Sequence, residues 1–590
     1  MPRVLTLYVL IFILILSSCT ENTSNNTSSN KALEQLFDSY WQKRLQLFPL
    51  EATAIGDNRY NNLLPISISS SYRDTLKTFY ADFLQQSKQL NTSLNDEDQI
   101  SKELFEYELG INLEALNFPT HLTPVNQFWS FMLEFPQLGS GDGNQPFKTP
   151  QDYDHFLARM QKFPAWIDTA ISNMRYGIQT GFTIPKALAI KVVPQVQSVI
   201  TPDATKNIFY QCVNKMPSTF SIDEQNKVKQ AYQYEIGKSI IPAYAKLKRF
   251  LVQDYIPACR NSHGISALPN GSAYYQYLIK QYTTTNLTPD SIYNLGLKEV
   301  AYLKSEMGKV KIQVGFTGDL SAFFEYINKD PQFYPFTTAK GVLDSFWSIQ
   351  KIAAPHLKTI FETTPKTPFE IRQTEAYRAA SASAEYNAGS EDGTRPGIFY
   401  VPILDPKKFN IVGMETLFLH EAIPGHHYQI SLQQENKTLP QFRKFLGYSA
   451  YAEGWALYTE TLGKDLHLYS NPYQYLGHLS DAMHRAIRLV VDVAIHTKGM
   501  SREEAIQYMM TNERISEAEA TAEIERYMAI PGQALSYKIG QITISGIRSS
   551  CEKDLGKRFN LASFHTQLLN GGNMPLEVLA KKLERWKKSF

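Results

Sequence analysis

The sequence predicts a mostly α-helical fold, in which one large multi-helix domain surrounds a deep cleft and carries a small β-sheet or hairpin near its most informative motif. Apolar residues recur at three- and four-residue intervals through stretches such as 33–48, 74–86 and 105–116, which is the periodicity of amphipathic helices. With 43% hydrophobic residues in a chain of 590, a large core is available. Composition does not change after residue 31, so we expect one domain over residues 32–590.

The first 31 residues are expected to be a targeting segment outside this domain. Arg3 precedes the apolar run VLTLYVLIFILIL and the small residues SSC, as in a secretory signal, and the run is too short for a comfortable membrane span. LSSC resembles a bacterial lipobox, which implies a signal peptide over residues 1–18, lipid attachment at Cys19 and a polar tether over residues 19–31. An ordinary signal peptide with an incidental Cys19 is the alternative.

Thr20 stands where an Asp would indicate retention in the inner membrane. We therefore expect a protein of the bacterial cell envelope, anchored through Cys19 in the outer membrane and facing the periplasm or the surface. The formal net charge of +2 and the 20% of charged residues argue against nucleic acid as a partner. Besides Cys19 the chain has Cys212, Cys259 and Cys551, which allow at most one internal disulfide and show no metal-binding spacing.

One stretch favours a strand instead of a helix. SEDGTRPGIFYVPI contains turn residues and then Gly397–Val401, a β-branched and aromatic run between prolines. Such a strand could bind an extended substrate along its edge, with Tyr400 as a substrate contact, or could be a buried strand with no ligand role.

The motif HEAIPGHHYQ, residues 420–429, is the strongest indication of chemistry. It differs from the zinc-protease pattern H-E-x-x-H because Pro424 occupies the place of the second histidine. A proline cannot continue a helix but is accepted in a first turn, so we expect one helix to end near Glu421 and another to begin near Pro424. The side chains of His426 and His427 would point about 100° apart on a helix. We favour His426 as the metal ligand, and we expect His427 to contact either the residues around the ligands or the substrate. A histidine-rich helix junction without metal is the alternative.

A third ligand is expected in SAYAEGWALYTE, residues 449–460. Glu453 would complete a His₂Glu set with His420 and His426, a recurring donor set for one catalytic Zn²⁺ with a position left for water. Glu460 shares the helical face of Glu453; we expect a solvated surface carboxylate there, with a role behind the metal ligands as the alternative.

Two further segments carry candidate residues. In HRAIRLVVDVAIH, Arg488, Asp492 and His496 follow one helical face, either as an ion-pair ladder or as a group in which Arg488 pairs with Asp492 and Asp492 orients a catalytic His496. The segment 517–540 should end one helix at Pro531-Gly532 and begin another with Tyr537, although spacing alone says little about this tyrosine. Arg488 or Arg548 could bind a substrate carboxylate.

Together these motifs resemble a known family. HEAIPGHHYQ, YAEGWALY, RLVVDVAIH and PGQALSYKIG occur in this order, with LFPLEATAIGDNRY and DGTRPGIFYV upstream, as in the bacterial family called domain of unknown function 885. That family in turn resembles helical zinc peptidases such as carboxypeptidase Taq and the oligopeptidases. The resemblance implies that His420, His426 and Glu453 bind zinc and that Glu421 is the base. It also implies that His496 and Tyr537 stabilise the reaction intermediate. The Pro-Gly insertion departs from the peptidase pattern and leaves the second histidine ligand open.

We therefore expect a zinc metallopeptidase that hydrolyses short peptides, with Glu421 as general base and His496 and Tyr537 at the oxyanion. A metal-dependent amidase or esterase with a non-peptide substrate, and a surface lipoprotein that binds peptides without turnover, are the alternatives.

Overall fold

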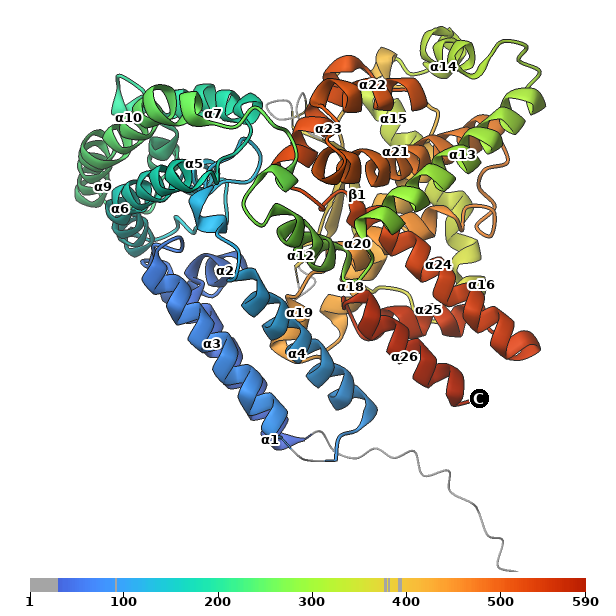
Figure 1. Cartoon of the computed structure of the whole chain (residues 1–590), viewed down its shortest axis with the longest axis horizontal. Coiled ribbons are helices and arrows are strands. Elements are labelled where there is room, and N and C mark those ends of the chain that lie inside the picture. The colour runs from blue at the N-terminus through green and yellow to red at the C-terminus, as the bar shows by residue number, and fades with distance from the viewer. Residues whose placement is uncertain (1–29, 91–92, 376–378, 380–382, 391–394) are drawn as a thin grey trace, which may run out of the picture.

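The computed structural model describes residues 30–90, 93–375, 379, 383–390 and 395–590, and within them it is mostly helical (Figure 1). The predicted signal peptide, Cys19 and most of the tether lie outside the described residues. None of the helices in these ranges combines the length and the apolarity that a membrane crossing requires. Cys212, Cys259 and Cys551 are buried free thiols, so the described part of the chain contains no disulfide.

The N-terminal helices confirm the three periodic stretches used for the prediction. They are α1 (Lys31–Leu47), α2 (Pro49–Ala54), α3 (Ser70–Gln89) and α4 (Asp96–Ala115). Side-chain caps set their starts: Asn30, Ser69 and Asn95 each accept a hydrogen bond from a backbone N–H of the first turn. Their apolar faces pack on the C-terminal half of the chain, where Phe37 and Phe105 contact Phe442.

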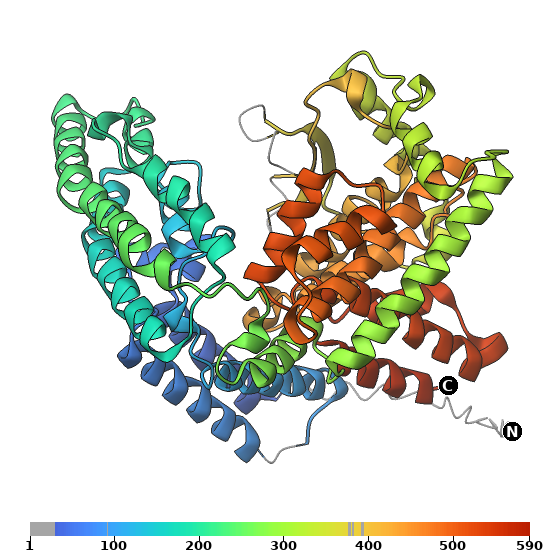
Figure 2. The ribbon, with the colours of Figure 1, turned by 45° about the horizontal axis from the view of Figure 1, so that its top comes forward.

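The next segment forms a lobe with a core of its own, seen as the teal and green arm in Figure 2. Its helices are α5 (Phe131–Gly139), α6 (Pro150–Thr180), α7 (Lys186–Val199), α8 (Gln211–Asn214), α9 (Ile222–Glu235), α10 (Ile241–Phe250) and α11 (Ile256–Ala258). Aromatic side chains such as Phe135, Phe163 and Tyr244 stack in its centre. The Gly- and Pro-containing stretch 140–149 is the loop between α5 and α6, as its composition indicates.

The C-terminal half contains the candidate site. It begins with α12 (Gly271–Thr283), α13 (Pro289–Gln313), α14 (Leu320–Lys329), α15 (Ala339–Ala353) and α16 (Leu357–Ile360). After a small sheet follow α17 (Met414–Glu421), α18 (His426–Glu435), α19 (Gln441–Lys444), α20 (Ser449–Glu460), α21 (Pro472–Thr497), α22 (Arg502–Asn512), α23 (Glu517–Ala529), α24 (Leu535–Leu555), α25 (Leu561–Leu569) and α26 (Leu576–Lys588). Helix α13 packs along α21, and α20 packs along α24.

The sheet consists of β1 (Phe369–Gln373), β2 (Glu385–Asn387) and β3 (Gly397–Val401) in the order β1-β3-β2. Strand β3 pairs with β1 in parallel and with β2 in antiparallel orientation, so that Phe399 stands opposite Ile371 and Tyr386. The strand predicted over 397–401 is confirmed, but the edge position considered for it is wrong, because hydrogen-bonded partners occupy both of its sides. Its β-branched and aromatic residues fit a central, buried strand.

Candidate metal centre

Three predicted ligands converge where α17, α18 and α20 meet. His420, His426 and Glu453 each offer one ligand atom, and these atoms lie within 4.8 Å of one another. The Nε2 atoms of His420 and His426 are each 3.6 Å from Oε2 of Glu453. The two imidazole rings are nearly perpendicular, at 88°, with centroids 4.9 Å apart. Two imidazole nitrogens and one carboxylate oxygen within this reach could hold a metal ion, and they are of the types that recur in catalytic zinc sites.

The Pro-Gly turn brings His426 back toward His420. Helix α17 ends at Glu421 and α18 begins at His426, as Pro424 predicts. A Cβ atom on Gly425 would lie 1.9 Å from the carbonyl oxygen of His420, so only glycine lets the chain pass this close to the end of α17. The indole N–H of Trp455 donates to the carbonyl of Pro424 at 2.9 Å. Helix α20 thus contacts the turn through Trp455 and also carries Glu453.

Glu460 contacts the imidazole nitrogen of His420 that does not face Glu453. Its Oε1 atom lies 2.8 Å from Nδ1 of His420, and the residue is 1% exposed. The expectation of a solvated carboxylate was therefore wrong: the face that Glu460 shares with Glu453 turns into the core. An Nδ1–H that donates to Glu460 leaves the Nε2 lone pair of His420 on the side of Glu453, the usual arrangement of a metal-binding histidine.

The electrostatics of the cluster favour a cation. Burial alone would lower the pKa of His420, but Glu453 and Glu460 outweigh it and raise that pKa to about 10. Burial likewise opposes ionisation of Glu453, yet the two histidines keep the pKa of its carboxyl well below the usual range. Two carboxylates that face one imidazole, Glu460 buried and Glu453 half-buried, therefore attract positive charge to this cluster.

His427 points away from this cluster. Its Nδ1 atom is 2.9 Å from the Tyr386 hydroxyl on β2, and its ring lies 4.8 Å from that of Phe369 on β1. Burial lowers its pKa to about 4, which keeps the ring neutral. His427 thus packs against the sheet, and the geometry favours His426 as the second ligand.

Glu421 and Tyr537 border the ligand cluster. Glu421 is buried, and burial raises the pKa of its carboxyl while the nearby His420 and His426 act in the opposite direction. Burial also raises the pKa of Tyr537, and the charge of Glu453 adds to this effect, so the phenol lies near that ligand. The Arg488 guanidinium covers the Tyr537 ring, with Cζ 4.6 Å from the ring centroid.

His496 lies elsewhere, and the catalytic role expected for it does not fit its contacts. It is fully buried, its Nδ1 accepts the backbone N–H of Ile265 at 3.1 Å, and its Nε2 donates to the carbonyl of Tyr527 at 3.0 Å. With both nitrogens used by backbone, His496 is a core residue that joins three segments of the chain.

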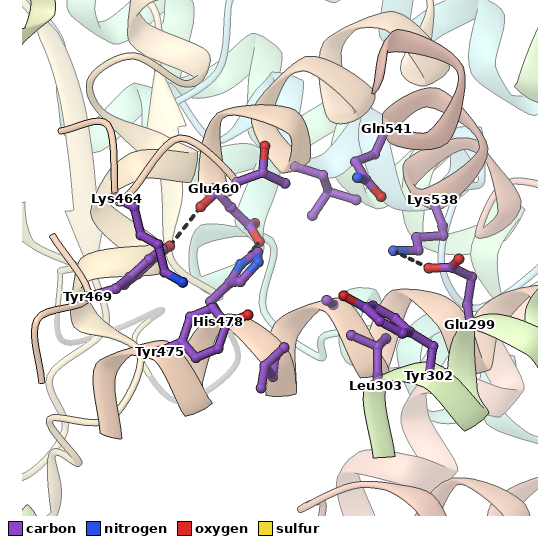
Figure 3. A pocket seen from close by; sticks show the side chains of 14 residues that line it. Glu299, Tyr302, Leu303, Glu460, Lys464, Tyr469, Tyr475, His478, Lys538 and Gln541 are labelled. Atoms are coloured by element: carbon purple, nitrogen blue, oxygen red, sulfur yellow. Dashed lines mark hydrogen bonds and ion pairs between the residues drawn. The ribbon is translucent and has the colours of Figure 1, made fainter. Parts of the chain in front are cut away.

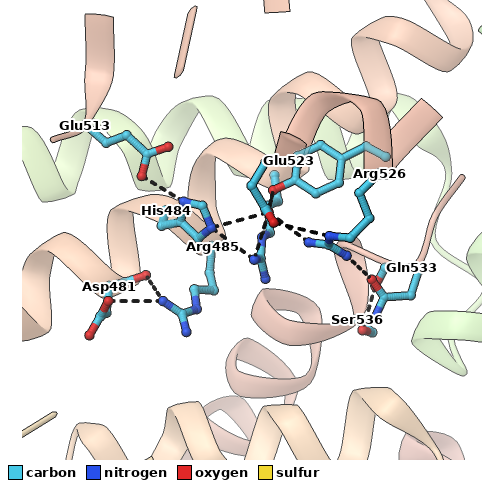
Figure 4. Close-up of polar contacts among 10 residues, drawn as sticks. Asp481, His484, Arg485, Glu513, Glu523, Arg526, Gln533 and Ser536 are labelled. Carbon is cyan, nitrogen blue, oxygen red and sulfur yellow. Dashed lines mark hydrogen bonds and ion pairs between the residues drawn. The ribbon is translucent and has the colours of Figure 1, made fainter. Parts of the chain in front are cut away.

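The predicted pairs of Asp492 are also wrong. Asp492 accepts from the Tyr275 hydroxyl at 2.5 Å and from the backbone N–H of Gly532 at 3.1 Å, and it binds neither His496 nor Arg488. Arg488 instead donates to the Tyr527 hydroxyl and to Glu523. Figure 4 shows the surrounding network, in which Glu523 lies between His484 and Arg526. Residues 486–496 of α21 are all buried, so a surface ion-pair ladder is excluded as well.

The two remaining candidates, Arg548 and Tyr400, lie on α24 and β3. Arg548 stands eleven residues beyond Tyr537 on α24, about 16 Å along the helix, and binds Glu552 and the Tyr458 hydroxyl. Tyr400 lies in the middle of the sheet, opposite Arg372 and Glu385.

Sequence reasoning missed Arg485 as a neighbour of the site. It donates to Asp481 at 3.2 Å on the same helix, and its charge opposes the rise in the pKa of Glu421 and of Tyr537. The only sign of it in the sequence is its spacing of three residues before Arg488 and four after Asp481, which is common on exposed helices.

Comparison with known proteins identifies relatives but no activity. A protein of Colwellia psychrerythraea, described as a predicted lipoprotein, has a crystal structure that matches with 26% identity and a TM-score of 0.86, over 95% of this chain and 99% of that chain. A structure from Shewanella oneidensis, described as a predicted lipoprotein of unknown function, has 22% identity and a TM-score of 0.73, over 93% and 99%, and supports the fold. No curated protein sequence matches the chain. The model of the family described as bacterial protein of unknown function (DUF885) matches residues 49–583, and the chain therefore belongs to this family.

Proposed function

We propose that the protein is a zinc-dependent hydrolase that cleaves peptide bonds in short peptides. The observation that carries the proposal is the convergence of His420, His426 and Glu453, whose ligand atoms lie within 4.8 Å. The site fits zinc because its donors are two imidazole nitrogens and a carboxylate, with Glu460 behind His420. Zinc held by these three residues would polarise a substrate carbonyl and acidify a water molecule.

Glu421 and Tyr537 are suited to the proton transfers and charge stabilisation that hydrolysis requires. The Glu421 carboxylate can accept a proton from the attacking water and then donate it to the leaving amine. Burial raises its pKa, which makes the protonated form easier to reach at neutral pH. The Tyr537 hydroxyl, near Glu453, can donate a hydrogen bond to the carbonyl oxygen as negative charge develops there.

The burial of the site supports short peptides as substrates. His420 is 6% and Glu421 is 7% exposed, and both stand at the end of a helix that is enclosed by α20 and α21. An extended chain of a few residues can enter such a site more readily than the surface of a folded protein. Nothing in the charge of the chain favours nucleic acid as a substrate.

We place the protein in the bacterial cell envelope, attached to the outer membrane by a lipid on Cys19. The LSSC motif and the polar tether support this location, as does the similar structure that is described as a predicted lipoprotein. The hydrolase would then meet peptides that are outside the cytoplasm.

The test begins with the metal content of the mature protein. We expect one zinc per chain in the wild type and none in Glu453→Ala, whereas Glu325→Gln, which removes an exposed carboxylate on α14, should keep its zinc. Glu421→Gln should keep zinc and lose hydrolysis of a short-peptide library by a factor of about 10²–10⁴. Wild-type zinc in Glu453→Ala would refute the metal site. A wild type that cleaves only simple amides or esters, or nothing, would refute the peptidase.

A further inference from the structure

A cavity lined by Glu460, the residue that binds His420, lies next to the candidate metal centre. It has a volume of about 310 Å³ and is enclosed by α13, α20, α21 and α24 (Figure 3). None of His420, Glu421, His426 and Glu453 lines it. Its size is at the lower end of small-molecule sites, which measure about 300–1,000 Å³.

The charged groups of this cavity balance. Glu299 and Glu460 contribute two negative charges, and Lys464 and Lys538 contribute two positive charges. Lys538 and Glu299 form an ion pair at 3.0 Å, and the lysine side chain is only 7% exposed. Glu460 is already engaged by His420 at 2.8 Å and lies 3.5 Å from Nδ1 of His478. Lys464 and the Lys538–Glu299 pair therefore remain to meet a ligand.

The arrangement of these charges selects a ligand that carries both signs. Figure 3 shows the Lys538–Glu299 pair on one wall and Lys464 on the opposite wall. The Lys464 Nζ atom lies 4.7 Å from the centroid of the Tyr475 ring. A lone anion or cation would be attracted by one partner of the ion pair and repelled by the other. A zwitterion can place each of its charges beside the opposite one.

The rest of the lining is apolar and aromatic. Leu303, Leu457, Leu479 and Ala482 contribute aliphatic surface, and Tyr302 contributes a ring. Such a surface favours an aliphatic side chain of leucine size, because contact with it removes apolar area from water. The cavity therefore combines a place for a zwitterion with a place for an apolar side chain.

We propose that this cavity binds a free amino acid with an apolar side chain. Its ammonium group lies beside Glu299, its carboxylate lies between Lys538 and Lys464, and its side chain contacts the leucines. Binding involves no bond cleavage and does not depend on the hydrolysis proposed for the metal centre. Free amino acids are products that a peptidase would release. The cavity would then be a product site, separated from His420 by the Glu460 carboxylate.

Calorimetric titration of the mature, zinc-loaded protein with three probes tests the ligand class. L-Leucine carries both charges, leucinamide lacks the carboxylate, and 4-methylpentanoate lacks the ammonium group. We expect L-leucine to bind at least about tenfold more tightly than either analogue, because a well-placed charge is worth about 1.4 kcal/mol or more. No binding of L-leucine, or equal binding of all three probes, would overturn the proposal.

Substitutions then locate the site. Lys464→Met should weaken L-leucine binding about tenfold, whereas Lys498→Met should not, although Lys498 also lies over a tyrosine ring, at 4.8 Å from that of Tyr293. Glu299→Gln should abolish the preference for L-leucine over 4-methylpentanoate. Ala482→Phe should fill the cavity and abolish binding, with the thermal midpoint as a check on folding. Unchanged affinity in Lys464→Met and Glu299→Gln would show that L-leucine binds elsewhere. Because binding is measured without turnover, this result is independent of whether peptides are cleaved.

Discussion

Glu460 contacts His420, a ligand of the proposed zinc site. The carboxylate fixes the Nδ1 side of the ring at 2.8 Å, so removing it should cost metal affinity without removing a donor. We expect Glu460→Leu to weaken zinc binding by about 10–100-fold, as is usual when the hydrogen-bond partner of a ligand histidine is lost. Competition with a chelating dye measures the change.

Two further variants help to interpret the zinc affinity of Glu460→Leu. Glu460→Gln should lose less affinity, because its amide oxygen can still accept from Nδ1. Glu108→Leu removes another buried carboxylate, which binds the Tyr448 hydroxyl at 2.9 Å, and should leave zinc affinity unchanged. Wild-type affinity in Glu460→Leu would show that this contact does not orient the ligand.

The adjacent histidines provide a matched pair of substitutions. We expect His426→Gln to lose zinc, because it removes the Nε2 atom 3.6 Å from Glu453. His427→Gln should retain one zinc per chain, because His427 contacts Tyr386 and the sheet. Metal analysis after dialysis distinguishes the two variants. Loss of zinc in His427→Gln alone would reverse the assignment.

At the residue scale the sequence predicted those site members whose signal is local. His420 and Glu421 are recognisable from their motif, and Glu453 from its residue type and interval. Glu460 and His496 were misjudged because burial depends on which helices pack around α20 and α21. Asp492 shows the same limit: a spacing of four residues permits a pair with His496, but Tyr275, distant in the sequence, binds it instead.

At the scale of elements, the contact of α20 with α24 sets the distance between Glu453 and Tyr537. Gly454 and Gly540 face each other there, and a Cβ atom on Gly540 would lie 1.9 Å from the carbonyl oxygen of Ala450. We expect Gly540→Ala to destabilise the protein by about 1–3 kcal/mol, since the helices must separate. The separation should also reduce hydrolysis, because it moves Tyr537 away from Glu453.

The control for this prediction is on the same helix. Gly546 has no atom within 4 Å of an added Cβ, so Gly546→Ala should stabilise α24 by about 0.5–1 kcal/mol through its helix propensity. Thermal denaturation compares the two variants. Equal midpoints would contradict the role of the close helix contact.

Element boundaries were largely predictable, but partners were not. Residues 501–504, SREE, have the sequence pattern of a capping box, and Ser501 and Glu504 form one at the start of α22, while Pro424 separates α17 from α18. Strand β3 could be predicted from its composition. Its central position depends on β1 and β2, which are short and show little of the residue pattern that predicts a strand. Strand pairing is a non-local property, so the stretch Gly397–Val401 alone could not reveal it.

At the scale of the whole molecule, the chain has separate hydrophobic cores, which its uniform composition does not indicate. Residues 125–259, together with Leu64, contain a separate hydrophobic core built around α6, while α1, α3 and α4 share a core with helices from the C-terminal half. Helical periodicity shows that each helix has a buried face but not which helix covers it. The mostly α-helical class could therefore be predicted, whereas the arrangement of the lobes could not.

The stability of the whole molecule should depend on pH through Asp492, which connects α21 to α12 and to the turn before α24. Burial raises the pKa of this carboxyl to about 7, although Tyr275 and Gly532 donate hydrogen bonds to it. Because the folded pKa exceeds the unfolded value of 3.8, the contribution of Asp492 to stability is complete below pH 3.8 and is lost as the pH rises to 7.

Asp492→Asn should remove this dependence while keeping the contacts of Oδ1. Both donors reach Oδ1 of Asp492, and the oxygen of an asparagine can accept from them in the same way, whereas the second contact of the Gly532 N–H, with Oδ2 at 3.2 Å, is lost at every pH. Relative to the wild type, the variant should gain up to about 4 kcal/mol in free energy of unfolding between pH 4 and pH 8. Urea denaturation across this range measures the difference, with the exposed Asp344→Asn as the control for loss of one carboxylate. A constant difference between Asp492→Asn and the wild type would show that Asp492 remains ionised throughout, and that its two donors outweigh its burial.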